Sequence, residues 1–145
     1  MEKELEKTLA IVKPDGMKNI EYIIEMIYKS GLKITDYKVE TLDKETLEEH
    51  YAHIVNEKFY PNVEQYMTSG PVAIMVLEGV NAVEKFRDLM GPTDSREAGP
   101  NTIRGKYGID KGTNAVHGSD SPKNAEIEIN RFFRENVKKL IKKEV

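Results

Sequence analysis

The chain has 145 residues, 39% of them hydrophobic and 32% charged, which suits one globular domain with a buried core and excludes a disordered or fibrous protein. The net charge of −3 provides no basic excess to neutralise phosphates, so no specific nucleic-acid partner is expected. The absence of cysteine excludes disulfides, thiolate catalysis and cysteine zinc sites, and with only three histidines no metal site built by the protein is expected.

Neither a targeting signal nor a membrane span is indicated. The first residues, M-E-K-E-L-E-K, lack the apolar core of a signal peptide, and no run approaches the roughly 18 apolar residues that cross a bilayer. No repeat or linker divides the chain. We therefore expect a single domain over residues 1–145 in the cytoplasm, without membrane contact.

The N-terminal part predicts a strand, a helix and a second strand. The apolar run Thr8–Pro14 indicates a strand that the Pro-Asp-Gly turn ends. Gly31 is a candidate C-cap for a helix with apolar residues at helical spacing: Ile20, Ile23, Ile24 and Ile27. Residues 32–42 alternate in two opposite phases, which predicts a strand with a bulge near Thr35–Asp36.

The middle of the chain predicts two short helices, a strand and a further helix. Asp43 would cap a helix with Leu47, Tyr51 and Ile54 on one face. Asn62 and Gln65 have the spacing of a capping box for a helix that ends at Gly70. The segment Pro71–Gly79 is apolar on both faces and indicates a buried central strand. Asn81 and Glu84 would cap a helix that buries Val83, Phe86 and Met90.

The C-terminal part predicts a long loop, a short strand and a last helix. Residues 91–112 are rich in turn formers and have no sustained period, with a short strand near Lys106–Ile109. Ser121 as N-cap and Pro122 at the first position would start the last helix. Its buried residues would be Ala125, Ile129, Phe132 and Phe133, and the basic tail, residues 137–145, would be solvated.

This order of elements favours an α+β fold. A ferredoxin-like sandwich fits best, with a four-stranded antiparallel sheet covered on one face by helices. A parallel doubly wound sheet is the competitor, but neither GxGxxG nor GxxxxGK[ST] occurs to support it.

His117 is the main candidate for chemistry. A lone histidine before a helix is more often structural, yet this one is followed by Gly118, which lets a ligand approach, and by the polar run Ser119–Ser121. Glu128 lies two helical turns beyond Ser121, at the edge of the buried stripe. A carboxylate there needs a partner, and an imidazole held by a carboxylate has a fixed tautomer and raised basicity. Together these residues predict a histidine nucleophile.

Cations that could hold phosphates lie elsewhere in the chain. Lys13 follows an apolar strand, where ligands commonly approach, and Arg87 and Arg104 could supply planar guanidinium groups. Taken singly, each is weak evidence, because a lysine at a strand end is commonly a surface residue and an arginine more often forms a surface salt bridge.

Four motifs of this chain resemble the nucleoside diphosphate kinase family: T-L-A-I-V-K-P-D-G, S-G-P-V, the span from G-P-T-D to T-I-R-G, and N-A-V-H-G-S-D-S. The resemblance runs from about Thr8 to Phe133. It implies reversible γ-phosphoryl transfer from ATP or another nucleoside triphosphate to a nucleoside diphosphate, in a ping-pong reaction through a phosphohistidine. The same fold and an enzyme that maintains nucleoside triphosphate pools are implied.

The resemblance also implies residue roles. His117 would carry the phosphoryl group, Glu128 would orient its ring and Ser119 would steady that glutamate. Lys13 and Asn114 would bind ribose and the reacting phosphate. The remaining nucleotide contacts would be Arg87, Thr93 and Arg104 for phosphate, Phe59 and Val63 for the base, and His50 and Tyr51 along the cleft. Mg²⁺ would be bound mainly through the nucleotide phosphates, and dimers would assemble into tetramers or hexamers.

The chain departs from the family after K-P-D-G. Where the family continues with an Arg-Gly pair and another glycine, this chain continues, slightly shorter, with M-K-N-I-E-Y-I-I. We expect a tight approach to the first helix, with altered contacts of that turn. Two alternatives are a phosphocarrier that keeps the phosphohistidine but binds no nucleotide, and a non-enzymatic nucleic-acid or regulatory module.

Overall fold

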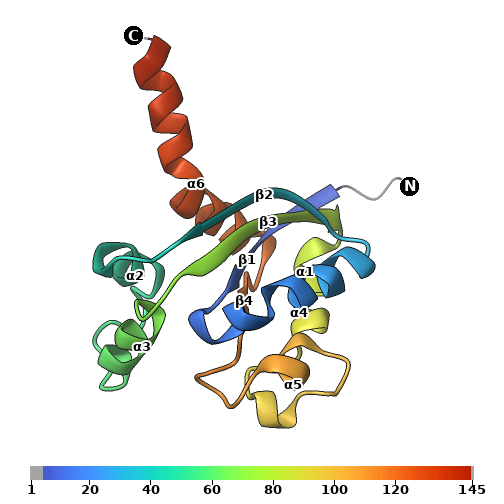
Figure 1. Cartoon of the computed structure of the whole chain (residues 1–145). Coiled ribbons are helices and arrows are strands. Elements are labelled where there is room, and N and C mark those ends of the chain that lie inside the picture. Colours follow the sequence, from blue (N-terminus) through green and yellow to red (C-terminus); the bar gives the residue numbers. More distant parts are fainter. Residues whose placement is uncertain (1–4, 145) are drawn as a thin grey trace.

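The structure, a computed structural model, describes residues 5–144, and residues 134–144 through their helical backbone alone. Strands and helices alternate along the chain (Figure 1). The elements in chain order are β1 (Leu5–Val12), the 3-10 helix η1 (Pro14–Asn19), α1 (Ile20–Lys29), β2 (Lys33–Glu40), α2 (Lys44–His50), α3 (Tyr60–Met67), β3 (Val72–Val80), α4 (Ala82–Met90), the 3-10 helix η2 (Ser95–Glu97), α5 (Ile103–Tyr107), β4 (Val116–Gly118) and α6 (Pro122–Glu144).

The strands form one antiparallel sheet in the order β2-β3-β1-β4, which confirms the ferredoxin-like α+β sandwich. The expected covering of one face only is wrong. One cluster of buried side chains joins the sheet to α1 and α4, and a second joins the opposite face to α2, α3 and α6. The second layer forms because both faces of the central strands are apolar, and each face needs a cover.

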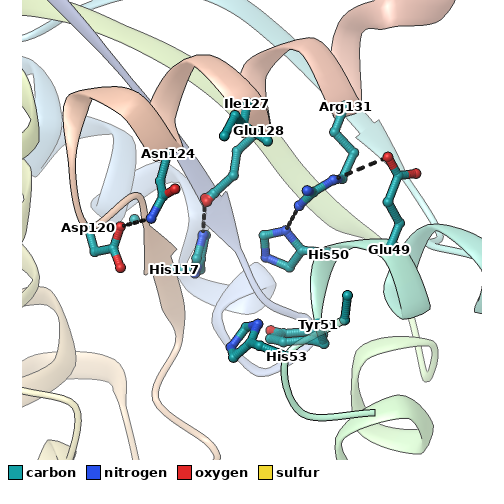
Figure 2. A pocket seen from close by; sticks show the side chains of 12 residues that line it. Glu49, His50, Tyr51, His53, His117, Asp120, Asn124, Ile127, Glu128 and Arg131 are labelled. Carbon is teal, nitrogen blue, oxygen red and sulfur yellow. Dashed lines mark hydrogen bonds and ion pairs between the residues drawn. The ribbon is translucent and has the colours of Figure 1, made fainter.

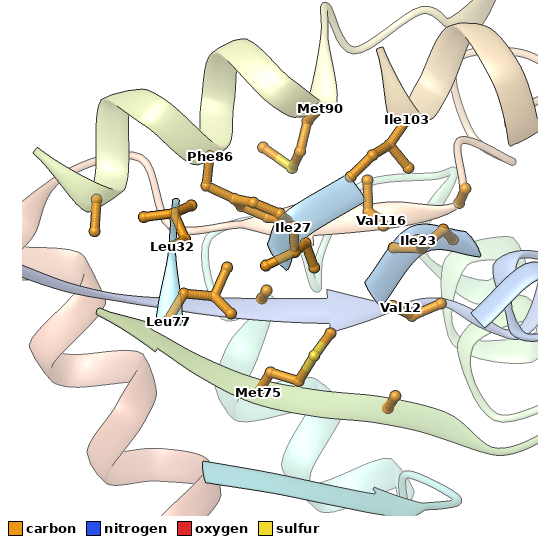
Figure 3. Close-up of a cluster of buried hydrophobic side chains, with 14 residues drawn as sticks. Val12, Ile23, Ile27, Leu32, Met75, Leu77, Phe86, Met90, Ile103 and Val116 are labelled. Atoms are coloured by element: carbon orange, nitrogen blue, oxygen red, sulfur yellow. The ribbon is translucent and has the colours of Figure 1, made fainter. Parts of the chain in front are cut away.

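Alternation along β1 explains the two clusters. Leu9 and Ile11 point to the α6 side, whereas Ala10 and Val12 point to the α1 and α4 side, and all four are fully buried. Phe86 of α4 lies in the middle of the cluster on the α1 and α4 side (Figure 3). β3 alternates in the same way and is central, as the sequence predicted.

Several local predictions are confirmed. The register of β2 against β3 shifts between Ile34 and Asp36, where the bulge was expected. The Asp43 carboxylate accepts a hydrogen bond of 2.8 Å from the Thr46 backbone N–H, and Ser121 Oγ accepts one of 3.1 Å from Asn124 N–H. Gly31 follows α1 with φ +92°, a conformation that glycine tolerates. The expected solvated tail, residues 137–145, lies outside the described side chains.

Two helix starts differ from the prediction. α3 begins at Tyr60, so Asn62 lies inside it and cannot cap it; Pro61 near the start fits this earlier beginning because proline tolerates the first turn. Asn81 precedes α4 as expected, but its side chain makes no cap hydrogen bond. The Glu6 carboxylate of β1 accepts from Val83 N–H instead, at 2.9 Å, a tertiary contact that no local pattern encodes.

The ends of α2 and the last strand were also predicted incorrectly. α2 ends at His50, so Ile54 lies beyond it. In the region expected as a strand, Lys106 and Tyr107 form the end of α5 and the next two residues are neither helix nor strand. Thr102 Oγ accepts from Gly105 N–H at 3.0 Å and caps this helix. The last strand is β4, which contains His117. This strand is too short to show an alternating pattern, and it exists only through its pairing with β1.

None of the helices in the described part of the chain is long and apolar enough to span a membrane.

Candidate active site

His117 lies on the edge strand β4 opposite Ile11, so its ring projects on the side of the sheet that α6 covers. Its Nε2 is 2.8 Å from Glu128 Oε1 (Figure 2). Ser119 Oγ donates to the same carboxylate oxygen at 3.1 Å and is buried. Because a carboxylate only accepts, Nε2 carries the proton of the neutral ring, and Nδ1 keeps its lone pair. The structure therefore brings these three predicted residues together.

The K-P-D-G turn docks onto the backbone that leads to His117. Lys13 N–H donates to the Ala115 carbonyl at 2.8 Å, and Ala115 N–H donates to Asp15 Oδ2 at 3.0 Å. A Cβ on Gly16 would lie 2.6 Å from the Ala115 oxygen, so only glycine permits this approach. Ala115 itself has φ 72°, an uncommon conformation that these contacts hold in place.

Lys13 and Asn114 form a second predicted pair. Lys13 Nζ donates to Asn114 Oδ1 at 2.8 Å, and the Asn114 amide donates to the carbonyls of Thr93 and Lys111 at 3.0 and 3.1 Å. Burial, followed by the charge of Arg104, lowers the pKa of Lys13 to about 8. Burial also raises the pKa of the neighbouring Asp15 carboxyl. Lys13 is therefore a half-buried amine that the charge of Asp15 offsets only in part, a setting that favours an anionic ligand.

A cavity of about 520 Å³ lies beside β4 and is lined by Arg87, Thr93, Arg104 and Asp120. The Arg104 guanidinium is fixed by hydrogen bonds to the carbonyls of Gly91 (3.0 Å) and Val116 (2.9 Å). Burial, then the charge of Arg87, lowers the pKa of Arg104 below its ordinary value. Arg87 Nη1 donates to the Asp120 carbonyl at 3.2 Å, so two guanidinium groups lie at one cavity and provide a site for phosphate oxygens.

His50 and Tyr51 lie on the other side of His117. The His50 and His117 rings meet edge to face with centroids 4.8 Å apart, and the rings of His50 and Tyr51 are also 4.8 Å apart. Burial, followed by nearby positive charge, lowers the pKa of His50 to about 2, and burial raises the pKa of Tyr51 to about 12. Both side chains are therefore neutral at ordinary pH.

Phe59 and Val63 stand apart from this group. Phe59 precedes α3 and is 51% exposed, whereas Val63 packs on the second core cluster. Neither lines the cavity of about 450 Å³ that opens beside His117. They share one helical turn, in which Val63 N–H donates to the Phe59 carbonyl at 3.3 Å.

Arg131 and the packing constraint at Gly118 were not predicted from the sequence, although Gly118 does line both cavities beside β4. Arg131 Nη1 contacts His50 Nδ1 at 2.9 Å, and its position one turn after Glu128 on the same helix could have revealed it. A Cβ on Gly118 would lie 2.7 Å from the Phe86 ring. The missing side chain thus makes room for α4, which is a packing reason that the sequence does not reveal.

Comparison with known proteins identifies the family. The family model described as nucleoside diphosphate kinase matches residues 6–137. A nucleoside diphosphate kinase of Thermobifida fusca is 46% identical over 131 residues, which cover 89% of this chain and 97% of the relative. One of Archaeoglobus fulgidus is 43% identical over 134 residues, which cover 91% of this chain and 89% of the relative.

Solved structures agree. The nucleoside diphosphate kinase of Aquifex aeolicus superposes with a TM-score of 0.86 at 40% identity, covering 90% of this chain and 96% of that one. A halophilic nucleoside diphosphate kinase of Halobacterium salinarum in complex with CDP superposes with a TM-score of 0.84 at 41% identity, covering 91% and 88%. The chain therefore belongs to the nucleoside diphosphate kinase family, and it is a phosphotransferase that acts between nucleoside triphosphates and diphosphates.

Proposed function

We propose that the transfer proceeds in two steps through a phosphohistidine on Nδ1 of His117. The observation that carries this proposal is the 2.8 Å contact between His117 Nε2 and Glu128, with Ser119 holding the same carboxylate. It keeps the proton on Nε2 and presents the Nδ1 lone pair as the nucleophile. Glu128 also stabilises the positive charge that the ring gains when Nδ1 forms its bond to phosphorus.

In the first step, the Nδ1 lone pair attacks the γ-phosphorus of a nucleoside triphosphate. The N–P bond forms, the bond from the γ-phosphorus to the bridging oxygen breaks, and a nucleoside diphosphate leaves with that electron pair. In the second step, a terminal phosphate oxygen of another diphosphate attacks the same phosphorus and the N–P bond breaks. His117 returns to its starting form, so neither step consumes a proton or an oxidant.

The phosphates would be held by the fixed cations around His117. Lys13 and Asn114 would bind the ribose hydroxyls and the phosphate nearest the reaction, and Arg87, Thr93 and Arg104 would bind the others. Their support is the cavity that the last three line and the carbonyl anchors of Arg104. Phosphoryl transfer depends mainly on such alignment and charge stabilisation.

The nucleoside would lie toward the outer end, with the base stacked between Phe59 and Val63 and the cleft bounded by His50 and Tyr51. Stacking on an aromatic ring does not distinguish one base from another. Broad specificity follows. Initial rates with purine and pyrimidine diphosphates test it, and a strong preference for a single base would contradict stacking as the main contact.

We assign Mg²⁺ as the divalent cation. Among the described residues, no group of three carboxylates stands ready to cage a hard cation, and the phosphate cavity contributes only Asp88 and Asp120 as acids. These residues fit an ion that phosphate oxygens hold. Asp120, which lines both the cavity beside His117 and the cavity with Arg87 and Arg104, would be the nearby carboxylate. Such an ion neutralises charge on the β- and γ-phosphates.

Self-association is also proposed, in dimers that build tetramers or hexamers. Its support is the edge strand β2, which exposes Tyr37 and Val39. Size-exclusion chromatography with light scattering tests it, and a monomer at working concentration would contradict it. The cytoplasmic location stays a prediction from the sequence.

The decisive experiment follows phosphate itself. Protein incubated with Mg·ATP labelled in the γ-phosphate should acquire acid-labile label on His117 and pass it to an added diphosphate. His117→Ala should acquire none while keeping its circular dichroism spectrum. Label that reaches the protein but no diphosphate would favour a phosphocarrier, and unlabelled wild-type protein would overturn the proposal.

A further inference from the structure

Three potential metal ligands converge beside the cavity at His117. His50, His117 and Glu128 each offer one ligand atom, and these atoms lie within 4.8 Å of one another. They come from three elements, the last residue of α2, the edge strand β4 and the second turn of α6 (Figure 2). Because the residues are far apart in the sequence, no spacing motif reveals the group.

The chemistry of the group suits a zinc-class ion and not magnesium. Two imidazoles and one carboxylate are a common donor set for three-ligand Zn²⁺ sites, with bonds of about 2.0–2.2 Å and a solvent molecule in the fourth position. Mg²⁺ prefers oxygen ligands. His50 and Glu128 are both only 8% exposed, and the cavity of about 450 Å³ beside them gives solvent access for the fourth position.

We propose that a divalent ion of the zinc class binds His50, His117 and Glu128 in the enzyme without nucleotide and blocks phosphorylation of His117. The ion binds the Glu128 carboxylate that otherwise accepts from His117 Nε2. It also holds the imidazole ring, so that a phosphoryl donor cannot react with it. The inhibition of phosphorylation rests on the proposed role of His117 as the phosphoryl carrier. The binding of the ion is independent of that role.

Arg131 sets the strength of this site. Its Nη1 contacts His50 Nδ1 at 2.9 Å, and its Nε lies 3.6 Å from Glu49 Oε1. An ion on Nδ1 must displace Arg131, and an ion on Nε2 must bind beside its positive charge. In both cases Arg131 weakens metal binding, so removal of its charge should strengthen it.

The binding test uses nucleotide-free protein, because nucleotides themselves chelate metal. Zn²⁺ is titrated in competition with a chromophoric chelator, and Co²⁺ serves as a second probe through its visible d–d absorption. We expect one ion per chain. His50→Ala should lower the affinity at least about 100-fold, since even hydrogen-bond partners of metal ligands are worth about 10–100-fold. Arg131→Gln should raise it.

His53→Ala is the matched control, because His53 lines the same cavity but lies outside the ligand group. It should bind Zn²⁺ like the wild type. Equal affinity in wild type, His50→Ala and Glu128→Gln would overturn the site, as would no d–d band with Co²⁺. Circular dichroism of each variant separates lost ligands from lost fold.

The blocking test measures labelled phosphate on His117 from Mg·ATP at free Zn²⁺ fixed by a metal buffer. At Mg·ATP well below saturation, the midpoint of inhibition should equal the dissociation constant from the titration, and it should rise as Mg·ATP is raised. In Arg131→Gln it should shift to lower Zn²⁺. Zn²⁺ binding without inhibition would overturn the block alone. A wild type that binds Zn²⁺ but is never phosphorylated would instead refute the proposed role of His117.

Discussion

The proposed nucleotide site has two ends, a phosphate end near His117 and a base end near Phe59, and they are built differently. At the phosphate end, Ser119 and Asn114 are almost fully buried, and Glu128 and Arg104 are less than 10% exposed. Each of these side chains has hydrogen-bond partners from separate elements. At the base end, Phe59 is 51% exposed.

The contrast follows from what each end has to do. In-line phosphoryl transfer requires the nucleophile and cations to be fixed within a fraction of an ångström, and buried hydrogen-bond networks provide that rigidity. Stacking tolerates displacement and any base, so an exposed ring is sufficient there. Substitutions of the residues that hold His117 should therefore lower kcat, whereas those at the base end should raise KM.

The largest effect is expected for Glu128→Gln. The amide can donate to Nε2 and so favour the tautomer with its proton on Nδ1, which removes the nucleophilic lone pair. We expect kcat to fall by about 10²–10⁴-fold, as for other losses of a residue that orients a histidine. Stopped-flow phosphorylation with Mg·ATP measures it. A fall of less than about fivefold would show that the carboxylate does not set the tautomer.

A smaller effect is expected from pH through Lys13. Its pKa of about 8 is below the ordinary value, so the amine is charged below about pH 8 and neutral above it. A bound phosphate favours the charged form, so diphosphate affinity should be full below pH 8 and fall by up to about tenfold per pH unit above it. Lys13→Gln should bind weakly at every pH and lose this slope. Equilibrium titrations across pH provide the measurement.

Phe59→Ala should test the outer end. Loss of stacking on a half-exposed ring removes about 1 kcal/mol, so KM should rise about fivefold for all nucleotides while kcat changes little. Steady-state kinetics with purine and pyrimidine diphosphates give the split. An equal fall in kcat would place Phe59 in the alignment of the reacting groups, and the contrast between the two ends would fail.

Two serines give the finest comparison. Ser119→Ala removes the donor to Glu128 and should lower kcat about threefold, with a loss of about 1 kcal/mol in the free energy of unfolding. Ser121→Ala removes the N-cap of α6 and should lower stability by about 1 kcal/mol without change in kcat. Urea unfolding and steady-state rates separate them. Equal kcat values in the two variants would show that Ser119 does not support catalysis through Glu128.

Much of the fold could be predicted because it is written in local patterns. The continuous apolar run in Pro71–Gly79, the change of phase near Thr35 and the cap at Asp43 all report the backbone of their own segment. Prediction failed where a distant partner decided the outcome. β4 is a strand because β1 pairs with it. The start of α4 is capped by Glu6, which belongs to β1.

The structure places His50 and Glu128 against His117, Ser119 against Glu128, and Lys13 against Asn114, whereas Phe59 and Val63 do not line the cavity beside His117. The nucleotide-binding roles of these residues stay a prediction. Arg131 and the meeting of His50 with His117 were not predicted, since both depend on how α2 and α6 pack on one face of the sheet.

The sequence by itself determined the chemical groups. These are the imidazole of His117, the carboxylate of Glu128 two helical turns beyond Ser121, and the cations Lys13, Arg87 and Arg104. The tertiary structure decided which nitrogen of His117 is free, what lowers the pKa of Lys13 and which side chains share a cavity. The physical reason is range. Side-chain type and spacing act within a helix or strand, whereas burial, hydrogen-bond partners and charge proximity depend on segments up to about a hundred residues apart that meet only in the folded chain.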